Sequence, residues 1–185
     1  MVICVTGQSG SGKSTLAKHL SNLNGYKYID VDSIVHRMYN NKIIMQKYVD
    51  TFGDSILVNG KVDRKEVAKI ALRTKSGFDK INNITWDYIE NKIDEKIKKY
   101  GNVVLDYKFL PLTKYFNDKN IKILVVADEN LRTQKIIARD KITKKELSLR
   151  EKHSPDFKKY KYDYIINNDY SEKFKKNILK ISCKR

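Results

Sequence analysis

The amino-acid sequence predicts an α/β fold in which a parallel five-stranded sheet is flanked by helices. Five short runs rich in β-branched and other apolar residues predict the strands, at residues 2–6, 28–31, 103–105, 121–126 and 164–166. Segments with apolar residues at helical spacing separate these runs, which is typical of a parallel sheet covered on both faces. Ligands of such folds bind beside the carboxyl ends of the strands, so residues that follow a strand are the first candidates for a site.

Helical segments account for much of the remaining chain. In order along the sequence they are expected at residues 16–23, 34–38, 43–52, 63–72, 81–97, 131–138 and 174–181. Asn59-Gly60 predicts a turn, and Asp63 with Glu66 predicts a capping pair at the start of the helix that follows. Because little strand is predicted between residues 34 and 100, we expect that stretch to form a helical region within a single domain spanning residues 1–185.

The composition predicts a protein that folds in a reducing compartment. The chain has 185 residues, of which 41% are hydrophobic, so it can bury a core without disulfides. Its cysteines are Cys4 and Cys183 alone, and no apolar run approaches the roughly 20 residues of a membrane span. We therefore expect a cytoplasmic protein that has no membrane partner.

The chain is strongly basic. Lys and Arg total 38 against 22 Asp and Glu, a formal net charge of +16. The basic residues are spread along the whole chain, which a biased amino-acid composition explains most simply. The alternative is attraction to nucleic acid, a membrane surface or a phosphate-rich metabolite, and net charge does not choose among these.

The stretch after the first predicted strand carries a phosphate-binding motif. The motif G-x-x-x-x-G-K-[ST] is matched by Gly7-Gln8-Ser9-Gly10-Ser11-Gly12-Lys13-Ser14. Glycines let backbone N–H groups approach phosphates, and the start of the following helix adds its positive dipole end. We expect Lys13 to reach the β- and γ-phosphates and the Ser14 hydroxyl to coordinate Mg²⁺. The sequence therefore predicts a P-loop NTPase-type fold, although the motif alone does not specify a reaction.

Acidic residues follow two of the predicted strands. Asp32 ends the segment Asp30-Val31-Asp32, where a carboxylate can accept a proton from an acceptor hydroxyl or help to hold the metal. Asp32 also precedes a helical pattern, so it can act as a helix N-cap, and the two roles can coexist. Asp106 follows an apolar strand, the pattern of a metal-associated carboxylate in P-loop enzymes, or else is an ordinary residue at a strand end.

Two arginines and an aromatic segment lie later in the chain. Arg139 opens a charged stretch, residues 139–153, that we interpret as a mobile lid carrying a cation to the transferred phosphoryl group. For Arg132 a place on a solvated helix face is the favoured interpretation. The segment 157–162 interleaves aromatic and lysine residues, which favours a partly buried helix over a base-stacking surface.

With these motifs placed, the chain resembles the dephospho-CoA kinase family over nearly its whole length. The similarity begins at Thr6–Thr15 and continues through Ile29–Asp32 with His36. It includes the run Phe52-Gly53, Ile56-Leu57, Gly60 and Asp63-Arg64, which unrelated P-loop proteins have no reason to share. Further matches are Val103–Asp106, Arg139-Asp140 and residues 163–168.

The resemblance implies ATP-dependent phosphorylation of the ribose 3′-hydroxyl of dephospho-CoA, the last step of coenzyme A synthesis. It implies that Lys13, Asp32 and Arg139 are catalytic, and that His36, Arg64 and Asp106 bind the acceptor. Residues 7–15 (Gly7 through Thr15) and Asn167 would bind ATP, with Mg²⁺ held by Ser14 and by Asp32 or Asp106. Residues 34–100 would form the acceptor-binding region and residues 139–153 the lid of a monomeric enzyme that does not bind nucleic acid.

The sequence departs from the family pattern near the expected acceptor site. Trp86-Asp87 stands where the family usually has His-Pro, and Lys108-Phe109 lies in the segment that usually reads Pro-Leu-Leu before a Glu. Two alternatives therefore stay open. One is another small P-loop kinase, for instance one acting on a nucleoside monophosphate, and the other is a non-catalytic ATP- or nucleic-acid-binding protein.

Overall fold

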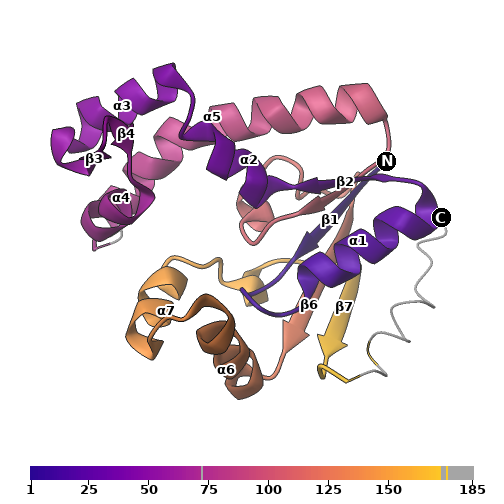
Figure 1. Ribbon diagram of the computed structural model, residues 1–185. Helices are drawn as coiled ribbons and strands as arrows, with labels where there is room; N and C mark the ends of the chain where they lie inside the picture. Colours follow the sequence, from indigo (N-terminus) through magenta and orange to yellow (C-terminus); the bar gives the residue numbers. More distant parts are fainter. Residues whose placement is uncertain (72, 172–173, 175–185) are drawn as a thin grey trace. The chain divides into compact units, whose positions relative to one another are not determined.

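The computed structural model describes residues 1–71, 73–171 and 174. The chain divides into two compact units (Figure 1). The first comprises Met1–Asp30 and Lys96–Arg185, and the second comprises Val31–Glu95. The sequence placed the limits of the helical region at residues 34 and 100, a few residues further along the chain.

The first unit contains a five-stranded parallel sheet, which confirms the predicted fold class. Its strands lie in the order β2-β5-β1-β6-β7. They are β1 (Val2–Thr6), β2 (Lys27–Asp30), β5 (Val103–Asp106), β6 (Ile121–Ala127) and β7 (Tyr164–Asn168). The central strand β1 pairs with β5 on one side and with β6 on the other, so the segment that follows it leaves the middle of the sheet.

The core of this unit forms between the sheet and helix α1 (Lys13–Asn24). All five residues of β1 are buried, as the apolar run predicted. Leu16, Ala17 and Leu20 of α1 pack against the buried side chains of β1 and β5. Burial of this apolar surface holds the start of α1 beside the carboxyl end of β1.

Two further helices follow strand β6 along the chain. Helix α6 (Glu129–Asp140) begins at an Asp128 cap, and α7 (Lys144–Glu151) begins at a capping box made by Thr143 and Glu146. The helices lie side by side beyond the carboxyl end of β6 (Figure 1). The charged stretch that we interpreted as a lid is therefore largely helical.

In the described residues of the second unit, helices predominate and the strands form one hairpin. Its helices are α2 (Val31–Met38), α3 (Lys42–Phe52), α4 (Arg64–Ala71) and α5 (Lys75–Tyr100), the last of which continues into the first unit. The hairpin joins β3 (Leu57–Val58) to β4 (Lys61–Val62) through Asn59-Gly60, both at positive φ, which confirms the turn. The Asp63 carboxylate accepts hydrogen bonds from the N–H groups of Lys65 and Glu66, which confirms the predicted cap.

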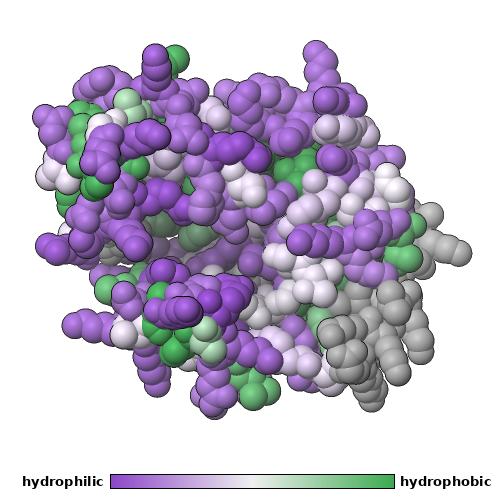
Figure 2. Space-filling view, viewed as in Figure 1, coloured by the Kyte–Doolittle hydropathy of each residue, from purple (hydrophilic) through white to green (hydrophobic). Residues whose placement is uncertain are grey.

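Four remaining observations concern the later part of the chain and the surface of the molecule. Segment 157–162, expected as a helix, is a single 3-10 turn at Phe157–Lys159 followed by extended chain. The expected last helix lies outside the described residues except for Phe174. Among the described helices, none has the length and apolar character needed to cross a membrane. Hydrophilic side chains cover most of the face shown in Figure 2, with apolar residues scattered among them.

Candidate active site

A cavity of about 450 Å³ lies at the loop that joins β1 to α1. Six of the predicted site residues line it, namely Gly10, Gly12, Lys13, Ser14, Thr15 and Arg139. The other predicted loop residues, Gly7, Gln8, Ser9 and Ser11, shape the same loop without lining the cavity. The cavity is therefore formed by the loop after β1, by helix α6 and by the turn after β7, as expected for a nucleotide site.

The loop has the backbone geometry of an anion site. Gly12 adopts a φ of 92°, and a Cβ at this position would overlap the side-chain amide of Asn168. Only glycine fits there, and it delivers the chain directly into α1 at Lys13. The first N–H groups of a helix have no partner within the helix and carry partial positive charge, so a phosphate is stabilised in front of them.

Asn168 contacts the phosphate loop and lines the cavity, whereas the sequence assigned ATP binding to the preceding residue, Asn167. Side chains alternate along β7, where Asn167 is exposed and Asn168 is 3% exposed. The Asn168 amide donates to the carbonyl of Ser11 at 2.9 Å and accepts from the Tyr170 N–H at 2.8 Å. Of the two adjacent asparagines, the strand register therefore turns Asn168 toward the loop and Asn167 toward solvent, and an ATP-binding role for Asn167 stays a prediction.

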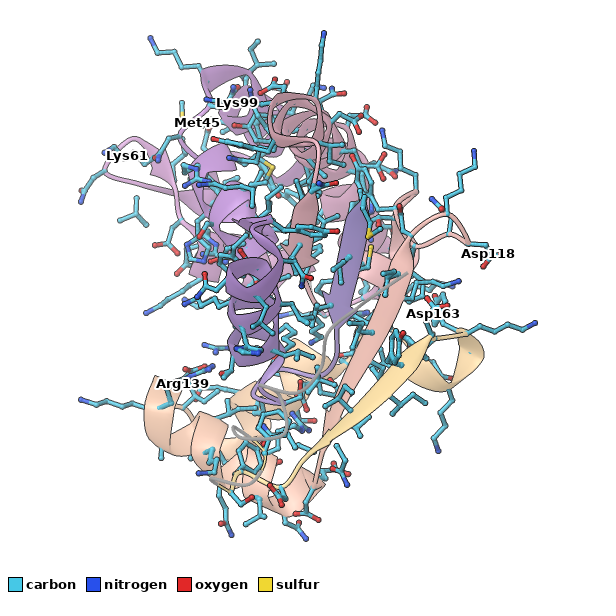
Figure 3. All side chains as sticks on the ribbon, turned by 90° about the vertical axis from the view of Figure 1, so that its right-hand side faces the viewer. Met45, Lys61, Lys99, Asp118, Arg139 and Asp163 are labelled. Atoms are coloured by element: carbon cyan, nitrogen blue, oxygen red, sulfur yellow. The ribbon has the colours of Figure 1, made fainter. Side chains whose placement is uncertain are left out.

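The two arginines of α6 differ sharply in environment. Arg139 lies in the last turn of α6, and its side chain is 63% exposed and projects from the helix (Figure 3). It donates to Asp140 at 2.7 Å, and this hydrogen bond raises the pKa of the guanidinium. Arg132, expected on a solvated face, is instead buried and pairs with Glu151. An exposed arginine on the cavity wall can reorient toward a ligand, whereas a buried one is fixed.

A buried carboxylate lies at the carboxyl end of β5. Asp106 is 3% exposed, and its Oδ2 accepts a hydrogen bond of 2.8 Å from the Tyr28 hydroxyl. Burial and the neighbouring Asp106 raise the pKa of Tyr28 well above its usual value. The Ser14 side chain lies near Tyr28 and partly offsets this rise in the pKa, so the predicted metal ligand is close to the Tyr28–Asp106 pair. In the sheet register Asp30 lies directly beside Asp106.

The carboxyl ends of β2 and β5, where Asp30 and Asp106 lie side by side, fit a magnesium ion. Among the described residues, none forms a hydrogen bond with Asp106 Oδ1, although that oxygen is buried. A buried carboxylate oxygen without a donor is costly, and a bound cation would remove the cost. In the described part of the chain, no group of three or more His, Cys, Asp or Glu side chains is arranged so that it could hold a metal ion by itself. Mg²⁺ does not need one, because it usually binds through one or two carboxylates together with substrate phosphates.

The segment after β5, where the sequence departs from the family pattern, contacts both the loop strand and α7. The carbonyl of Lys108 accepts a hydrogen bond of 2.9 Å from Thr6 Oγ1. The Lys108 side chain is buried, and its Nζ lies 3.5 Å from the carbonyl of Arg150 near the end of α7. A cation is favourable at a helix C-terminus, so Lys108 stabilises α7 in this position.

The remaining predicted residues belong to the second unit. Asp32 is exposed and lies in the first turn of α2, which begins at Val31. It is therefore inside the helix and not the N-cap residue that precedes it. Its negative charge is still favourable at this end of the helix dipole. The Arg64 guanidinium lies 2.7 Å from the His36 ring and 5.5 Å from the centroid of the Tyr39 ring. These contacts bring His36 and Arg64, both expected to bind the acceptor, into one cluster.

The aromatic residues of segment 157–162 pack against other parts of the protein. Phe116 packs edge-on against Tyr160 and Tyr162, and the Tyr162 hydroxyl donates to the Phe157 carbonyl. Rings engaged in this way do not form an open stacking platform, so the segment is partly buried as expected, although it is not the helix that was expected.

Four functional candidates were not identified from sequence, namely Tyr28, Arg132, Asn168 and Tyr170. The sequence favours a surface position for Arg132, and the matched segment 163–168 contains Asn168 although Asn167 was the residue assigned to ATP. Tyr28 and Tyr170 belong to no motif. Tyr28 is the one that pattern reasoning could have found, since the hydroxyl of a partly buried tyrosine in a strand usually has a polar partner.

Comparison with known proteins relates this geometry to a family. A family model described as Dephospho-CoA kinase matches residues 1–173. The dephospho-CoA kinase of Fusobacterium nucleatum is 33% identical over 174 residues, which cover 91% of this chain and 90% of that protein. The dephospho-CoA kinase of Wolinella succinogenes is 29% identical over 175 residues, covering 90% of this chain and 85% of that protein.

Solved structures show the same architecture. Dephospho-CoA kinase from Campylobacter jejuni superposes with a TM-score of 0.66 at 25% identity, covering 97% of this chain and 94% of that one. A Thermus thermophilus protein, TT1252, gives a TM-score of 0.80 at 23% identity over the same shares of the two chains. At that identity the second likeness supports the fold alone.

Proposed function

Because the chain belongs to the dephospho-CoA kinase family, we infer that it transfers the γ-phosphoryl group of ATP to the ribose 3′-hydroxyl of dephospho-CoA. The reaction is the last step of coenzyme A biosynthesis and yields coenzyme A and ADP. One observation carries the assignment of its ATP site: Lys13, Ser14 and Arg139 line a single cavity at the start of α1. The roles of individual residues below are proposals built on that premise.

On the ATP side, the loop of residues 7–15 would hold the phosphates through its N–H groups and the dipole of α1. Lys13 would lie against the β- and γ-phosphates and offset the charge that develops as the phosphoryl group leaves. Arg139 would turn from Asp140 toward the same group. Its high exposure and its place on the cavity wall support this role.

Ser14 and Asp106 would hold Mg²⁺, with Tyr28 fixing the orientation of the carboxylate. The buried, unpartnered Asp106 Oδ1 supports this assignment over one in which Asp106 binds the acceptor. When bound, Mg²⁺ neutralises charge on the β- and γ-phosphate oxygens. The residues of this chain supply the Ser14 hydroxyl, the Asp106 carboxylate and the hydrogen bond from Tyr28 that orients the carboxylate.

On the acceptor side, Asp32 would act as the general base. The 3′-oxygen forms a bond to the γ-phosphorus while the bond from that phosphorus to the ADP oxygen breaks, and Asp32 would take the hydroxyl proton. Its exposure leaves the carboxylate accessible, and its position two residues after β2 supports the role. The cluster of His36 and Arg64 would contact the anionic acceptor.

Replacement of Lys13 tests the ATP side. Lys13→Ala should lower kcat/KM by about 10²-fold or more, since it removes a cation from the transferred group. The fold should survive, because glycines and backbone contacts shape the loop. Lys61→Ala, which removes an exposed lysine of β4 (Figure 3), is the matched control and should keep full activity. A Lys13→Ala enzyme with more than about a tenth of wild-type activity would refute the role.

Replacement of Asp32 tests the acceptor side. Asp32→Asn keeps the shape of the side chain but removes its basicity, so kcat should fall by roughly 10²-fold while ATP affinity changes little. Asp54→Asn removes an exposed carboxylate elsewhere in the same unit and should have no such effect. A fully active Asp32→Asn enzyme of lowered stability would show that Asp32 serves only the helix.

A further inference from the structure

Arg132 is a buried cation that contacts the phosphate loop. It lies on α6, and only 5% of its side-chain surface is exposed. Its Nη1 donates to the carbonyl of Ser9 at 3.1 Å, a contact between residues 123 positions apart. A Cβ at Gly10 would meet the Arg132 stem at 3.4 Å, so the aliphatic part of the side chain lies directly under the loop.

The charge of Arg132 is balanced by α7. Nη1 and Nη2 donate to the two carboxylate oxygens of Glu151, at 2.5 and 3.1 Å. Burying an arginine is costly unless it is paired and hydrogen-bonded, and a two-pronged contact with a carboxylate meets that need. The same guanidinium therefore contacts the loop on one side and the last residue of α7 on the other.

Three consecutive carbonyl groups of the loop are held by side chains from outside it. Ser9 accepts from Arg132, Gly10 accepts from the Tyr170 hydroxyl at 2.8 Å, and Ser11 accepts from Asn168 at 2.9 Å. In a trans peptide the C=O of one residue and the N–H of the next point in opposite directions. Holding the Ser9 and Ser11 carbonyls therefore directs the N–H groups of Gly10 and Gly12 to the other side of the loop.

We propose that Arg132 is a positioning residue for ATP binding, which holds the phosphate loop in its anion-binding conformation and joins it to α7 through Glu151. The inference rests on the proposed function, because it assumes that this loop binds the phosphates of ATP. It goes further in assigning to α7 a part in shaping the loop. Disruption of the Arg132–Glu151 pair should therefore weaken ATP binding without affecting the acceptor.

A double variant separates loop positioning from support of the fold. Arg132→Met alone leaves Glu151 without its partner and should lower Tm. Arg132→Met with Glu151→Leu replaces both charged groups by apolar ones, which usually restores stability. Methionine also keeps an unbranched stem under Gly10. We expect a Tm within about 3 °C of wild type for the double variant, yet at least about tenfold weaker ATP binding, or about 1.4 kcal/mol.

The measurements are ATP affinity by calorimetry without acceptor, and KM for each substrate. The KM for ATP should rise with the dissociation constant, while the KM for dephospho-CoA should change less than about twofold. Lys122→Met is the control, since Lys122 is also buried and paired with a carboxylate, Asp118, at the opposite end of β6 (Figure 3). It should leave ATP affinity unchanged.

Arg132→Lys provides a second variant that keeps the charge. Lysine lacks the planar fork and cannot serve Ser9 and Glu151 together, so ATP binding should again weaken. Wild-type ATP affinity in the double variant or in Arg132→Lys would overturn the inference, as would equal weakening by Lys122→Met. A wild-type protein that does not bind ATP would instead refute the proposed function itself.

Discussion

Asn168 offers the sharpest test of how the nucleotide site is built. Its amide donates to the Ser11 carbonyl and accepts from the Tyr170 N–H, and it is almost fully buried against Gly12. Asn168→Asp preserves the size of the side chain and its ability to accept from Tyr170. It removes the donor to Ser11 and places a carboxylate against that carbonyl, beside the loop that receives phosphates.

The size of the effect follows from these contacts. Leaving a buried acceptor without its donor costs about 1–3 kcal/mol. Repulsion between the new carboxylate and the phosphates adds to this, so the total should lie at or above the upper half of that range. A loss of about 2–3 kcal/mol corresponds to roughly 30- to 150-fold weaker ATP binding.

Calorimetric titration with ATP measures this change directly. Asn167→Asp is the matched control, because it makes the same chemical change one residue earlier on the exposed side of β7. We expect the control to bind ATP within about threefold of wild type, since exposed charges are screened. If Asn167→Asp weakened binding more than Asn168→Asp, the sequence assignment would stand and the reasoning from strand register would be refuted.

Three further outcomes are expected. Tyr28→Phe removes the donor to Asp106 and should lower the free energy of unfolding, measured by urea denaturation, by about 1–3 kcal/mol; an unchanged midpoint would contradict this. Because the pKa of Tyr28 is raised above 10.0, the folded protein keeps a proton that the unfolded chain loses at alkaline pH. The free energy of unfolding should therefore fall as pH rises above about 10, and less steeply in Tyr28→Phe, while equal slopes would show that Tyr28 is not the group responsible. Hydrogen exchange across residues 139–153 should slow when an ATP analogue and Mg²⁺ bind, and equal exchange with and without ligand would remove the lid proposal.

The parts of the structure that sequence predicted correctly are encoded locally. The central strand β1 is a short run made mostly of β-branched residues, and the phosphate loop is a motif of eight residues whose glycines allow the backbone to turn. The hairpin turn at Asn59-Gly60 and the cap at Asp63 likewise depend on residues within a few positions of each other.

The parts that sequence missed depend on contacts between distant residues. Tyr28 and Asp106 are 78 positions apart, and Arg132 is 123 positions from Ser9. No periodicity shows that a polar helix residue will meet a loop from the far end of the chain. Helix α7 was missed for a different reason, since it has only one buried residue, Leu147, and so little apolar spacing. Its capping box was the available signal.

The identity of the phosphorylated product tests the assigned reaction most directly. The protein should be incubated with Mg-ATP and dephospho-CoA, and the product identified by mass spectrometry with the new phosphate located on the ribose. The family assignment and the cavity around Lys13 predict coenzyme A and ADP in equal amounts, with no ADP formed when dephospho-CoA is omitted. ADP formation with a nucleoside monophosphate but not with dephospho-CoA would contradict the account, as would binding of ATP without any transfer.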